Sequence, residues 1–310
     1  MNKIRRVMIV GLGALGTLYA DAFQKTENTE VFVLVDEERK QRYEKDGRIL
    51  NGEKCSFNYV LPKTSDAEKE PMDLILVCTK SNGMHMALNM IEGYVGDDTI
   101  IASLMNGVSF EELAIEKYGA GHVIYMVYLG DGVKNLNGEV YDTNINNLFF
   151  GSLGNPNDDE QVGLLDEFFS RAGIGYGIKE DMLYDYWRKC ILIVSFNEAC
   201  AVFGTDYSVF HNAPEAMTLA KGLLKECIPV ARAAGVKNAD EYMDDISAAA
   251  MNIDPACMPS IMQDRLMKRR MEVDILADEI IRRSRLLGLK TPYCDMVSLI
   301  LNVINKQNGF

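Results

Sequence analysis

Short apolar runs alternate with amphipathic segments over the first 180 residues of the chain. The apolar runs, rich in Val, Ile and Leu, are residues 7–10, 31–35, 74–77, 99–103 and 123–127. The segments with helical character are residues 17–24, 37–45, 84–94 and 110–118. Strands that alternate with helices are typical of a parallel sheet covered by helices on both faces. The pattern therefore predicts an α/β fold with a doubly wound parallel sheet.

Two Asn-Gly pairs predict β-hairpin turns. Asn51-Gly52 separates residues 49–50 from the apolar stretch 56–60, and Asn137-Gly138 precedes residues 139–141 and 148–151. Asn-Gly favours the two-residue turns in which both central residues have positive φ. We expect the first hairpin to be inserted after the second strand–helix unit.

The pattern changes after residue 180. From Asp181 onward almost every segment has helical periodicity, and no Gly/Ser-rich linker marks the transition. A chain of 310 residues is long for one hydrophobic core. We therefore predict two closely packed domains: 1–180, a Rossmann-type domain with the parallel sheet, and 181–310, an all-α domain.

A glycine-rich loop follows the first predicted strand directly. It consists of Gly11, Leu12, Gly13, Ala14, Leu15 and Gly16. In a G-x-G-x-x-G loop the first glycine permits a tight turn, the second lets the backbone approach a pyrophosphate, and the third lets the helix pack on the strand. The strand before it and the helix after it favour a dinucleotide site over a glycine turn without a ligand.

The type of dinucleotide is less clearly marked. Asp36 follows the second strand, about twenty residues past the glycine loop, where a carboxylate usually binds the ribose hydroxyls of NAD. Arg39, Lys40 and Arg42 follow and would suit the 2′-phosphate of NADP. Asp36 could also be a helix N-cap with no ligand. These residues leave the choice between NAD and NADP open.

Composition excludes several kinds of partner. The net charge of −13 argues against nucleic acid and against an anionic membrane surface. No apolar run reaches the ~20 residues that span a bilayer, and no signal peptide pattern precedes the first strand. The seven cysteines and three histidines are scattered, which predicts reduced thiols and no structural metal site. We expect a cytoplasmic protein.

Four polar residues lie where chemistry is expected. Lys80 and Asn106 each follow a predicted strand, at the sheet edge where doubly wound folds bind ligands, although each also fits a turn or cap. Lys189 and Glu272 each lie on an apolar helix face of the second domain. Lys189 could extend to solvent or be held inside by a partner. A buried ammonium and a buried carboxylate are natural partners, because either one alone is costly to bury.

Together these features resemble the ketopantoate reductase family over nearly the whole chain. The residues that carry the resemblance are 11–16, Lys80, Asn106-Gly107, Trp187-x-Lys189, Asn197, 259–264, Glu272-Val273-Asp274 and Thr291-Pro292. The most specific feature is the spacing from the Ser-x-Met-Gln-Asp run, which begins at Ser260, to Glu272-x-Asp274.

The resemblance implies an NADPH-dependent reduction of 2-dehydropantoate (ketopantoate) to pantoate, a step toward pantothenate and coenzyme A. By this analogy Lys189 is the general acid, and Glu272 holds the substrate hydroxyl and orients the lysine. Asn106, Asn197 and Ser260 would contact nicotinamide or substrate. The implied partner is a small 2-keto acid, and the sequence leaves the oligomeric state open, a homodimer included.

Three positions depart from the family pattern. Ile193 replaces a usual asparagine, Asp278 replaces a usual glycine, and Asp36 stands where NADPH-using members often have arginine. The first two bear on the substrate and the third on the cofactor. The alternative within the superfamily is an NAD-dependent D-2-hydroxyacid dehydrogenase acting on branched 2-keto acids.

Two more distant alternatives are disfavoured. A nucleotide-sensing regulator without catalysis should lack the lysine or the glutamate, and both Lys189 and Glu272 are present. A β-hydroxyacid dehydrogenase of the phosphogluconate type also has a lysine acid, but the Ser-x-Met-Gln-Asp run argues against it.

Overall fold

The computed structural model describes residues 3–63, 70–130, 134–136, 139–141, 145–154 and 159–310. The chain forms two compact units. The first comprises Met1–Met105 and Ser109–Met182, and the second comprises Asn106–Val108 and Leu183–Phe310. The assignment of 1–180 as the nucleotide-binding domain and of 181–310 as the substrate and catalytic domain stays a prediction.

The first unit is built around a parallel sheet. Its strands are β1 (Arg6–Val10), β2 (Glu30–Leu34), β3 (Arg48–Leu50), β4 (Glu53–Cys55), β5 (Asn58–Val60), β6 (Leu74–Val77), β7 (Ile100–Ser103), β8 (Tyr125–Tyr128), β9 (Lys134–Leu136), β10 (Glu139–Tyr141), β11 (Leu148–Gly151) and β12 (Tyr176–Ile178). Its helices are α1 (Ala14–Gln24), α2 (Glu37–Asp46), α3 (Met84–Met90), α4 (Phe110–Tyr118) and α5 (Glu160–Arg171). The main sheet has the strand order β5-β2-β1-β6-β7, and each pair of neighbouring strands in it is parallel. The predicted doubly wound sheet is confirmed.

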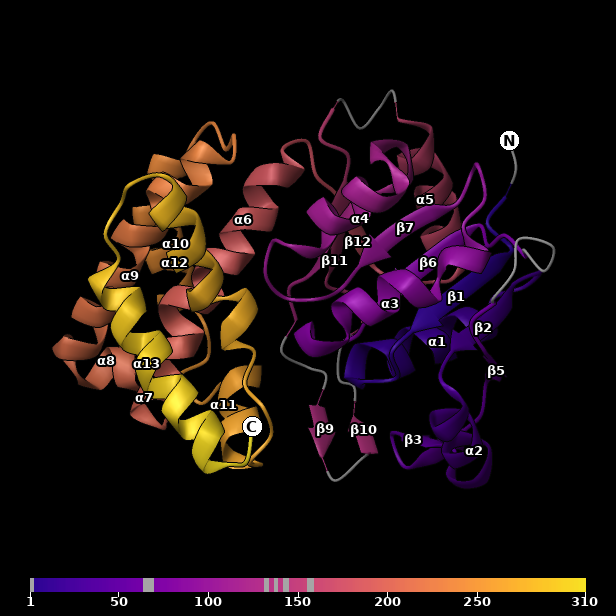
Figure 1. Ribbon diagram of the computed structural model, residues 1–310, viewed down its shortest axis with the longest axis horizontal. Helices are drawn as coiled ribbons and strands as arrows, with labels where there is room; N and C mark the ends of the chain where they lie inside the picture. The colour runs from indigo at the N-terminus through magenta and orange to yellow at the C-terminus, as the bar shows by residue number, and fades with distance from the viewer. Residues whose placement is uncertain (1–2, 64–69, 131–133, 137–138, 142–144, 155–158) are drawn as a thin grey trace. The chain divides into compact units, whose positions relative to one another are not determined.

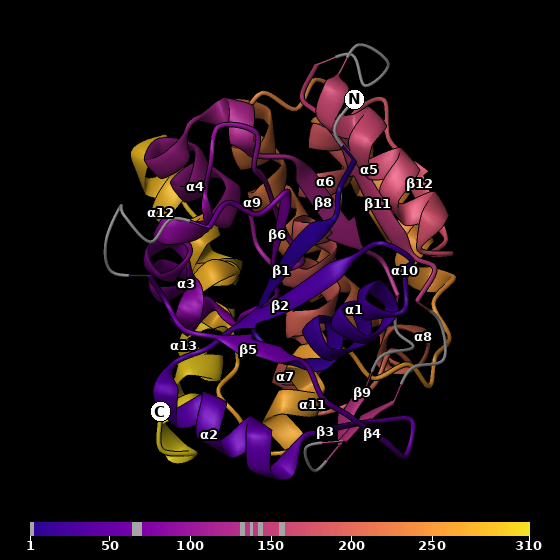
Figure 2. The ribbon, with the colours of Figure 1, turned by 90° about the vertical axis from the view of Figure 1, so that its right-hand side faces the viewer.

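Side chains alternate between the two faces of this sheet. In β1, Val7 and Ile9 belong to one buried cluster, and Met8 and Val10 belong to another. Figure 2 shows the sheet between α3 and α4 on one side and α1 and α5 on the other. Because both faces are covered, the strands appear in the sequence as continuous apolar runs.

The predicted fifth strand has a different role from the other four. Ile101 of β7 and Val123, just before β8, form a single parallel bridge. Strand β8 then pairs antiparallel with β11, and β11 pairs parallel with β12. The sheet β12-β11-β8 thus follows on from the parallel one.

The first Asn-Gly hairpin is present, but its predicted second strand is wrong. Asn51 and Gly52 have φ of 53° and 82°, as the turn requires, and β3 pairs antiparallel with β4 so that Leu50 faces Glu53. A two-residue turn pairs the residues directly beside it, which leaves β5 free to join the main sheet next to β2. The second pair, Asn137-Gly138, lies outside the described residues, and β9 and β10 on either side of it are antiparallel.

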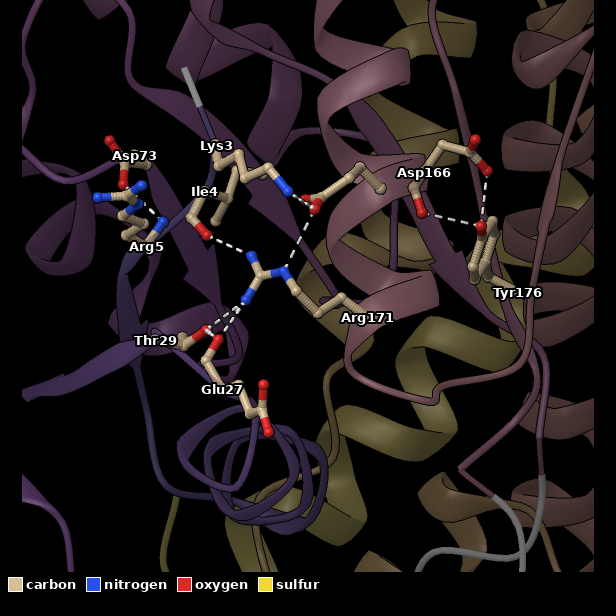
Figure 3. A network of polar contacts seen from close by, with 10 residues as sticks. Lys3, Ile4, Arg5, Glu27, Thr29, Asp73, Asp166, Arg171 and Tyr176 are labelled. Atoms are coloured by element: carbon tan, nitrogen blue, oxygen red, sulfur yellow. Dashed lines mark hydrogen bonds and ion pairs between the residues drawn. The ribbon is translucent and has the colours of Figure 1, made fainter. Parts of the chain in front are cut away.

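Helix α5 is tied to the edge from which β1 starts. The Arg171 guanidinium donates to the carbonyl oxygens of Ile4 and Glu27, both at 2.6 Å, and to Thr29 Oγ1 at 3.0 Å (Figure 3). The Asp73 carboxylate accepts from the backbone N–H of Arg5 in the same region (Figure 3). These contacts fix the start of β1, and the glycine loop extends from its other end.

The second unit is helical. Its helices are α6 (Met182–Leu192), α7 (Glu198–Phe203), α8 (Val209–Asn212), α9 (Pro214–Ala233), α10 (Tyr242–Met251), α11 (Ser260–Leu266), α12 (Ala277–Leu286) and α13 (Pro292–Gln307), as Figure 1 labels them. Residues 183–310, all of which the structure describes, contain no strand. The predicted fold class, a Rossmann-type parallel sheet plus an all-α part, is confirmed.

Candidate active site

The three glycines of the glycine loop meet different constraints. A Cβ on Gly11, which has φ of 99°, would lie 2.9 Å from the backbone of Cys78 and Thr79. A Cβ on Gly16 would lie 1.9 Å from the carbonyl oxygen of Gly11. A Cβ on Gly13 would meet only the Cys78 carbonyl oxygen at 3.8 Å, an ordinary contact. Packing within the protein thus accounts for the first and third glycines but not for the second.

A cavity of about 300 Å³ opens beside this loop. Its lining includes Gly11, Leu12 and Gly13 from the loop, Thr79 and Lys80 after β6, and Arg39 and Tyr43 from α2. Ala14, Leu15 and Gly16 form the first turn of α1 and are not among the lining residues. No side chain caps the N-terminus of α1 and no acidic residue lies in its first turn, so its N–H groups are suited to an anion.

Asp36 caps the next helix. Its Oδ1 accepts from the backbone N–H of Arg39 at 2.7 Å, and its Oδ2 pairs with Arg39 Nη1 at 2.7 Å. The structure thus gives Asp36 the N-cap role that the sequence left as an alternative. Both side chains are nearly half exposed, so the ion pair adds only about 0–1 kcal/mol to stability. The Arg39 guanidinium therefore partly neutralises this carboxylate beside the cavity.

A π-helical turn, Ile193–Asn197, joins α6 to α7. Lys189 and Asn197 are eight residues apart, which in a regular α-helix would separate them by about 80° around the axis. A π turn absorbs one extra residue, so the effective spacing is seven and the separation falls to about 20°. The turn therefore aligns Asn197 with Lys189 on one helix face. Both side chains are partly exposed, whereas residues 193–196 are buried.

The side chain of Asn197 is held by a tyrosine that the sequence did not single out. The Tyr207 hydroxyl donates to Asn197 Oδ1. Tyr207 is buried, and this burial raises its pKa well above the usual range, so its hydroxyl stays protonated. No sequence motif marks Tyr207, because it lies in the loop between α7 and α8.

The expected helix face for Glu272 is wrong: the residue lies outside any helix, just before the 3-10 turn Val273–Ile275, and is partly exposed. The buried Asn305 side chain of α13 accepts from the Met271 N–H and donates to the Met271 carbonyl oxygen, both at 3.0 Å. A Cβ on Gly107 would lie 2.7 Å from the Ile275 carbonyl oxygen. The second unit thus brings the Asn106-Gly107 pair against the segment that carries Glu272.

Ser260 is the first residue of α11 and is exposed. Its helix is tied to α7 by Arg265, whose guanidinium donates to the carbonyl oxygens of Ala201 and Val202 where α7 ends. The predicted pairing of Lys189 with Glu272, and the roles assigned to the predicted site residues, stay predictions.

A fully buried carboxyl, that of Glu198, was missed by the sequence analysis. Glu198, next to Asn197, has no exposed surface, and neither of its oxygens makes a well-formed hydrogen bond. Burial raises its pKa well above the usual range, and the nearby carboxylate of Asp278 adds to the shift, while the Ala277 N–H opposes it. Asp278 itself accepts from Ser298 Oγ at 2.5 Å, so this departure from the family pattern contacts α13.

Two features are absent from the described residues. No group of three or more His, Cys, Asp or Glu side chains there is arranged to hold a metal ion. None of the helices in the same part of the chain is long and apolar enough to cross a membrane.

A glycine-loop parallel sheet, followed by a helical unit, defines the Rossmann-type two-unit class. Residues 7–155 match the family model described as ketopantoate reductase PanE/ApbA. Residues 181–305 match the model described as ketopantoate reductase PanE/ApbA C terminal. The chain belongs to the ketopantoate reductase family and is an oxidoreductase, as the resemblance implied.

Relatives and solved structures agree with this placement. A 2-dehydropantoate 2-reductase of Streptococcus pyogenes serotype M6 is 24% identical over 303 residues, which cover 96% of both chains. D-mandelate dehydrogenase, solved with NADH and anilino(oxo)acetate, has a TM-score of 0.82 at 19% identity and covers 98% of this chain and 100% of its own. A dimeric ketopantoate reductase from Staphylococcus aureus has a TM-score of 0.75 at 18% identity, with the same coverage. These structural likenesses concern the fold alone.

Proposed function

We propose that the chain catalyses the NAD(P)H-dependent reduction of 2-dehydropantoate to pantoate, in pantothenate and coenzyme A biosynthesis. Family membership and the named activity of its relatives support this substrate. The observation that carries the proposal is the π turn, which aligns Asn197 with Lys189 on one helix face. A proton donor, Lys189, and an amide, Asn197, on the same helix face suit a small acid with a reducible carbonyl.

The glycine loop suits a nicotinamide dinucleotide. The packing of the protein would tolerate a Cβ at Gly13, so the absence of a side chain there suits the approach of a ligand. The loop lines the cavity beside it, and no acidic residue lies in the first turn of α1 to compete with a phosphate. Leu12 and Lys80 line the same cavity. When bound, this cofactor supplies the hydride.

We favour NADPH over NADH as that cofactor. The Asp36 carboxylate is already engaged by the α2 N-terminus and by Arg39, which reduces its repulsion of a 2′-phosphate. Arg39 lines the cavity and can contact such a phosphate.

The acid–base chemistry is assigned to the second unit. Lys189 donates the proton to the carbonyl oxygen of the substrate, after polarising it as an ammonium. Glu272 accepts a hydrogen bond from the substrate 4-hydroxyl and orients the lysine. Asn106, Asn197 and Ser260 bind the remaining polar groups of the substrate or the nicotinamide amide.

An initial-rate panel tests the reaction, with NADPH and NADH each offered with ketopantoate and with 2-ketoisovalerate. We expect NADPH with ketopantoate to give the highest kcat/KM, because 2-ketoisovalerate lacks the hydroxyl and leaves a carboxylate unpaired. Equal turnover of 2-ketoisovalerate would overturn the pantoate assignment. A tenfold preference for NADH would overturn the choice of NADPH.

One observation favours a second candidate, an NAD-dependent D-2-hydroxyacid dehydrogenase acting on branched 2-keto acids. Ile193, at the start of the π turn, is only 6% exposed and is apolar where the family usually has asparagine. Such a residue suits a more apolar substrate. The same rate panel separates the two candidates.

We also infer that the protein acts in the cytoplasm as a homodimer. Met296, Leu299 and Val303 lie at helical spacing on α13 and are 58%, 63% and 48% exposed. An exposed apolar strip of this kind suits an interface with a second copy. We expect a dimer mass by light scattering for the wild type and a monomer for Leu299→Glu. A monomeric wild type would refute the homodimer.

A further inference from the structure

We propose that Tyr207 is a positioning residue for the substrate site, whose hydroxyl fixes the side-chain amide of Asn197 so that the NH₂ group is presented to a substrate oxygen. This inference rests on the proposed function, in which Asn197 contacts the substrate. It adds a residue that neither the sequence motifs nor the family resemblance marked.

The contact defines the orientation of the amide. An asparagine side chain has one acceptor oxygen and one NH₂ donor group, and a rotation of 180° exchanges them. The Tyr207 hydroxyl donates to the Asn197 oxygen. In the reversed orientation the Asn197 NH₂ group would face the Tyr207 hydroxyl, and two donors would meet whenever the hydroxyl proton points at Asn197. The observed orientation therefore leaves the NH₂ group for other partners.

The surroundings keep Tyr207 in place. Its side chain is only 2% exposed, its ring packs at 5.5 Å from that of Phe210, and its backbone N–H donates to the Cys257 carbonyl oxygen at 3.2 Å. The ring of Phe210 in turn packs on Phe196, which lies within the π turn. A buried hydroxyl in such a setting requires a hydrogen-bond acceptor, and the Asn197 oxygen provides it.

Two independent constraints thus act on Asn197. The π turn sets the direction in which its Cα–Cβ bond leaves the helix, on the face of Lys189. Tyr207 sets which end of the amide faces away from the buried side. The first depends on the backbone and the second on a side chain from another segment, so either can be altered without the other.

The orientation has a chemical consequence. An exposed NH₂ group recognises an acceptor oxygen, such as the carboxylate or the keto oxygen of a 2-keto acid, and a bond to a charged oxygen is the stronger kind. A group that can only donate, such as an ammonium, is not accepted at this position. Tyr207 therefore favours an acceptor oxygen of the substrate at this position.

The test compares Tyr207→Phe with a matched control, Tyr242→Phe. Tyr242 is also buried in the second unit, and its hydroxyl donates to the Tyr184 carbonyl oxygen at 2.7 Å. We expect Tyr207→Phe to raise KM for ketopantoate about tenfold, the equivalent of one net hydrogen bond, with kcat changed less than threefold. Tyr242→Phe should leave both constants within a factor of two.

A double-mutant cycle with Asn197→Ala provides the decisive kinetic readout. If Tyr207 acts through Asn197, adding Tyr207→Phe to Asn197→Ala should change KM no further. Fully additive effects would overturn the proposal, because Tyr207 would then act by another route. An equal response of Tyr207→Phe and Tyr242→Phe would overturn it as well.

A second measurement does not depend on turnover. The side-chain NH₂ signal of Asn197 in a ¹⁵N NMR spectrum, assigned by its loss in Asn197→Ala, should shift in Tyr207→Phe and not in Tyr242→Phe. An unshifted signal would overturn the positioning role. Failure of the wild type to reduce any 2-keto acid would overturn the proposed function instead, and the NMR comparison would still decide how Asn197 is held.

Discussion

The glycine-loop region of the first unit and the Lys189–Asn197 region of the second are positioned by different means. In the first, backbone packs on backbone: the space that Gly11 and Gly16 leave empty is filled by the chain itself. In the second, a π turn and the side chain of Tyr207, from another segment, hold Asn197 in place. Backbone packing at glycines defines one region, and a side-chain contact defines the other. Substitutions should therefore damage the two regions in different ways.

The largest expected effect is on chemistry in the second region. Lys189→Ala should lower kcat by a factor on the order of 10²–10⁴, the usual contribution of a general acid. Nucleotide binding, followed by nicotinamide fluorescence, should survive because the glycine loop is unchanged. A variant with near-normal kcat would remove Lys189 from the mechanism.

Two glycine variants in the first region separate an effect on protein stability from an effect on nucleotide binding. Gly16→Ala places a Cβ 1.9 Å from a carbonyl oxygen and should destabilise the fold by about 1–3 kcal/mol or more. Gly13→Ala should leave stability within about 0.5 kcal/mol but weaken nucleotide binding by at least about tenfold. Thermal unfolding and fluorescence titration measure the two effects. Equal loss of stability in both variants would contradict this division.

Asn305→Ala tests the support of Glu272 from α13. It leaves the N–H and carbonyl of Met271 without their partner and should cost about 1–3 kcal/mol, with a fall in kcat/KM of about tenfold. The matched control is Asn302→Ala on the same helix, whose bond to Asp278 is longer at 3.4 Å and should matter less. Urea unfolding and steady-state kinetics provide the comparison. If Asn305→Ala lowered the free energy of unfolding but left kcat/KM unchanged, Asn305 would stabilise the fold without positioning Glu272 for the reaction.

The last expected effect depends on pH and concerns Glu198. A buried carboxyl with a raised pKa holds its proton in the folded state where the unfolded chain has lost it, so stability should fall as pH rises above the unfolded pKa of about 4.3. Glu198→Gln removes this loss, and its advantage over the wild type should grow with pH, by at most about 1.4 kcal/mol per pH unit.

Urea unfolding at several pH values between 5 and 8 measures this difference. The exposed Glu180→Gln is the matched control and should follow the wild-type profile. Parallel profiles for Glu198→Gln and the wild type would show that Glu198 ionises normally in the folded protein.

Much of the first unit could be predicted from the sequence. Apolar runs identified most strands of the parallel sheet, and the glycine loop identified residues that line the cavity, because both signals depend on neighbours in the chain. The second strand of the first hairpin was predicted wrongly, because the sequence does not show which strand pairs with which. Asn51-Gly52 fixed the turn, but only sheet pairing decided that β5 belongs beside β2.

The sequence by itself also determined the family and marked Lys189, Asn197, Ser260 and Glu272 as candidates, since residue identity and spacing are local properties. Only the tertiary structure decided how some of them are held. The π turn changes the helical phase between Lys189 and Asn197, which a regular period does not predict. Tyr207 and Asn305 reach their targets from other segments, and Glu198 is buried by packing around α7. Helical phase and long-range contacts depend on how the whole chain packs, and no local motif encodes them.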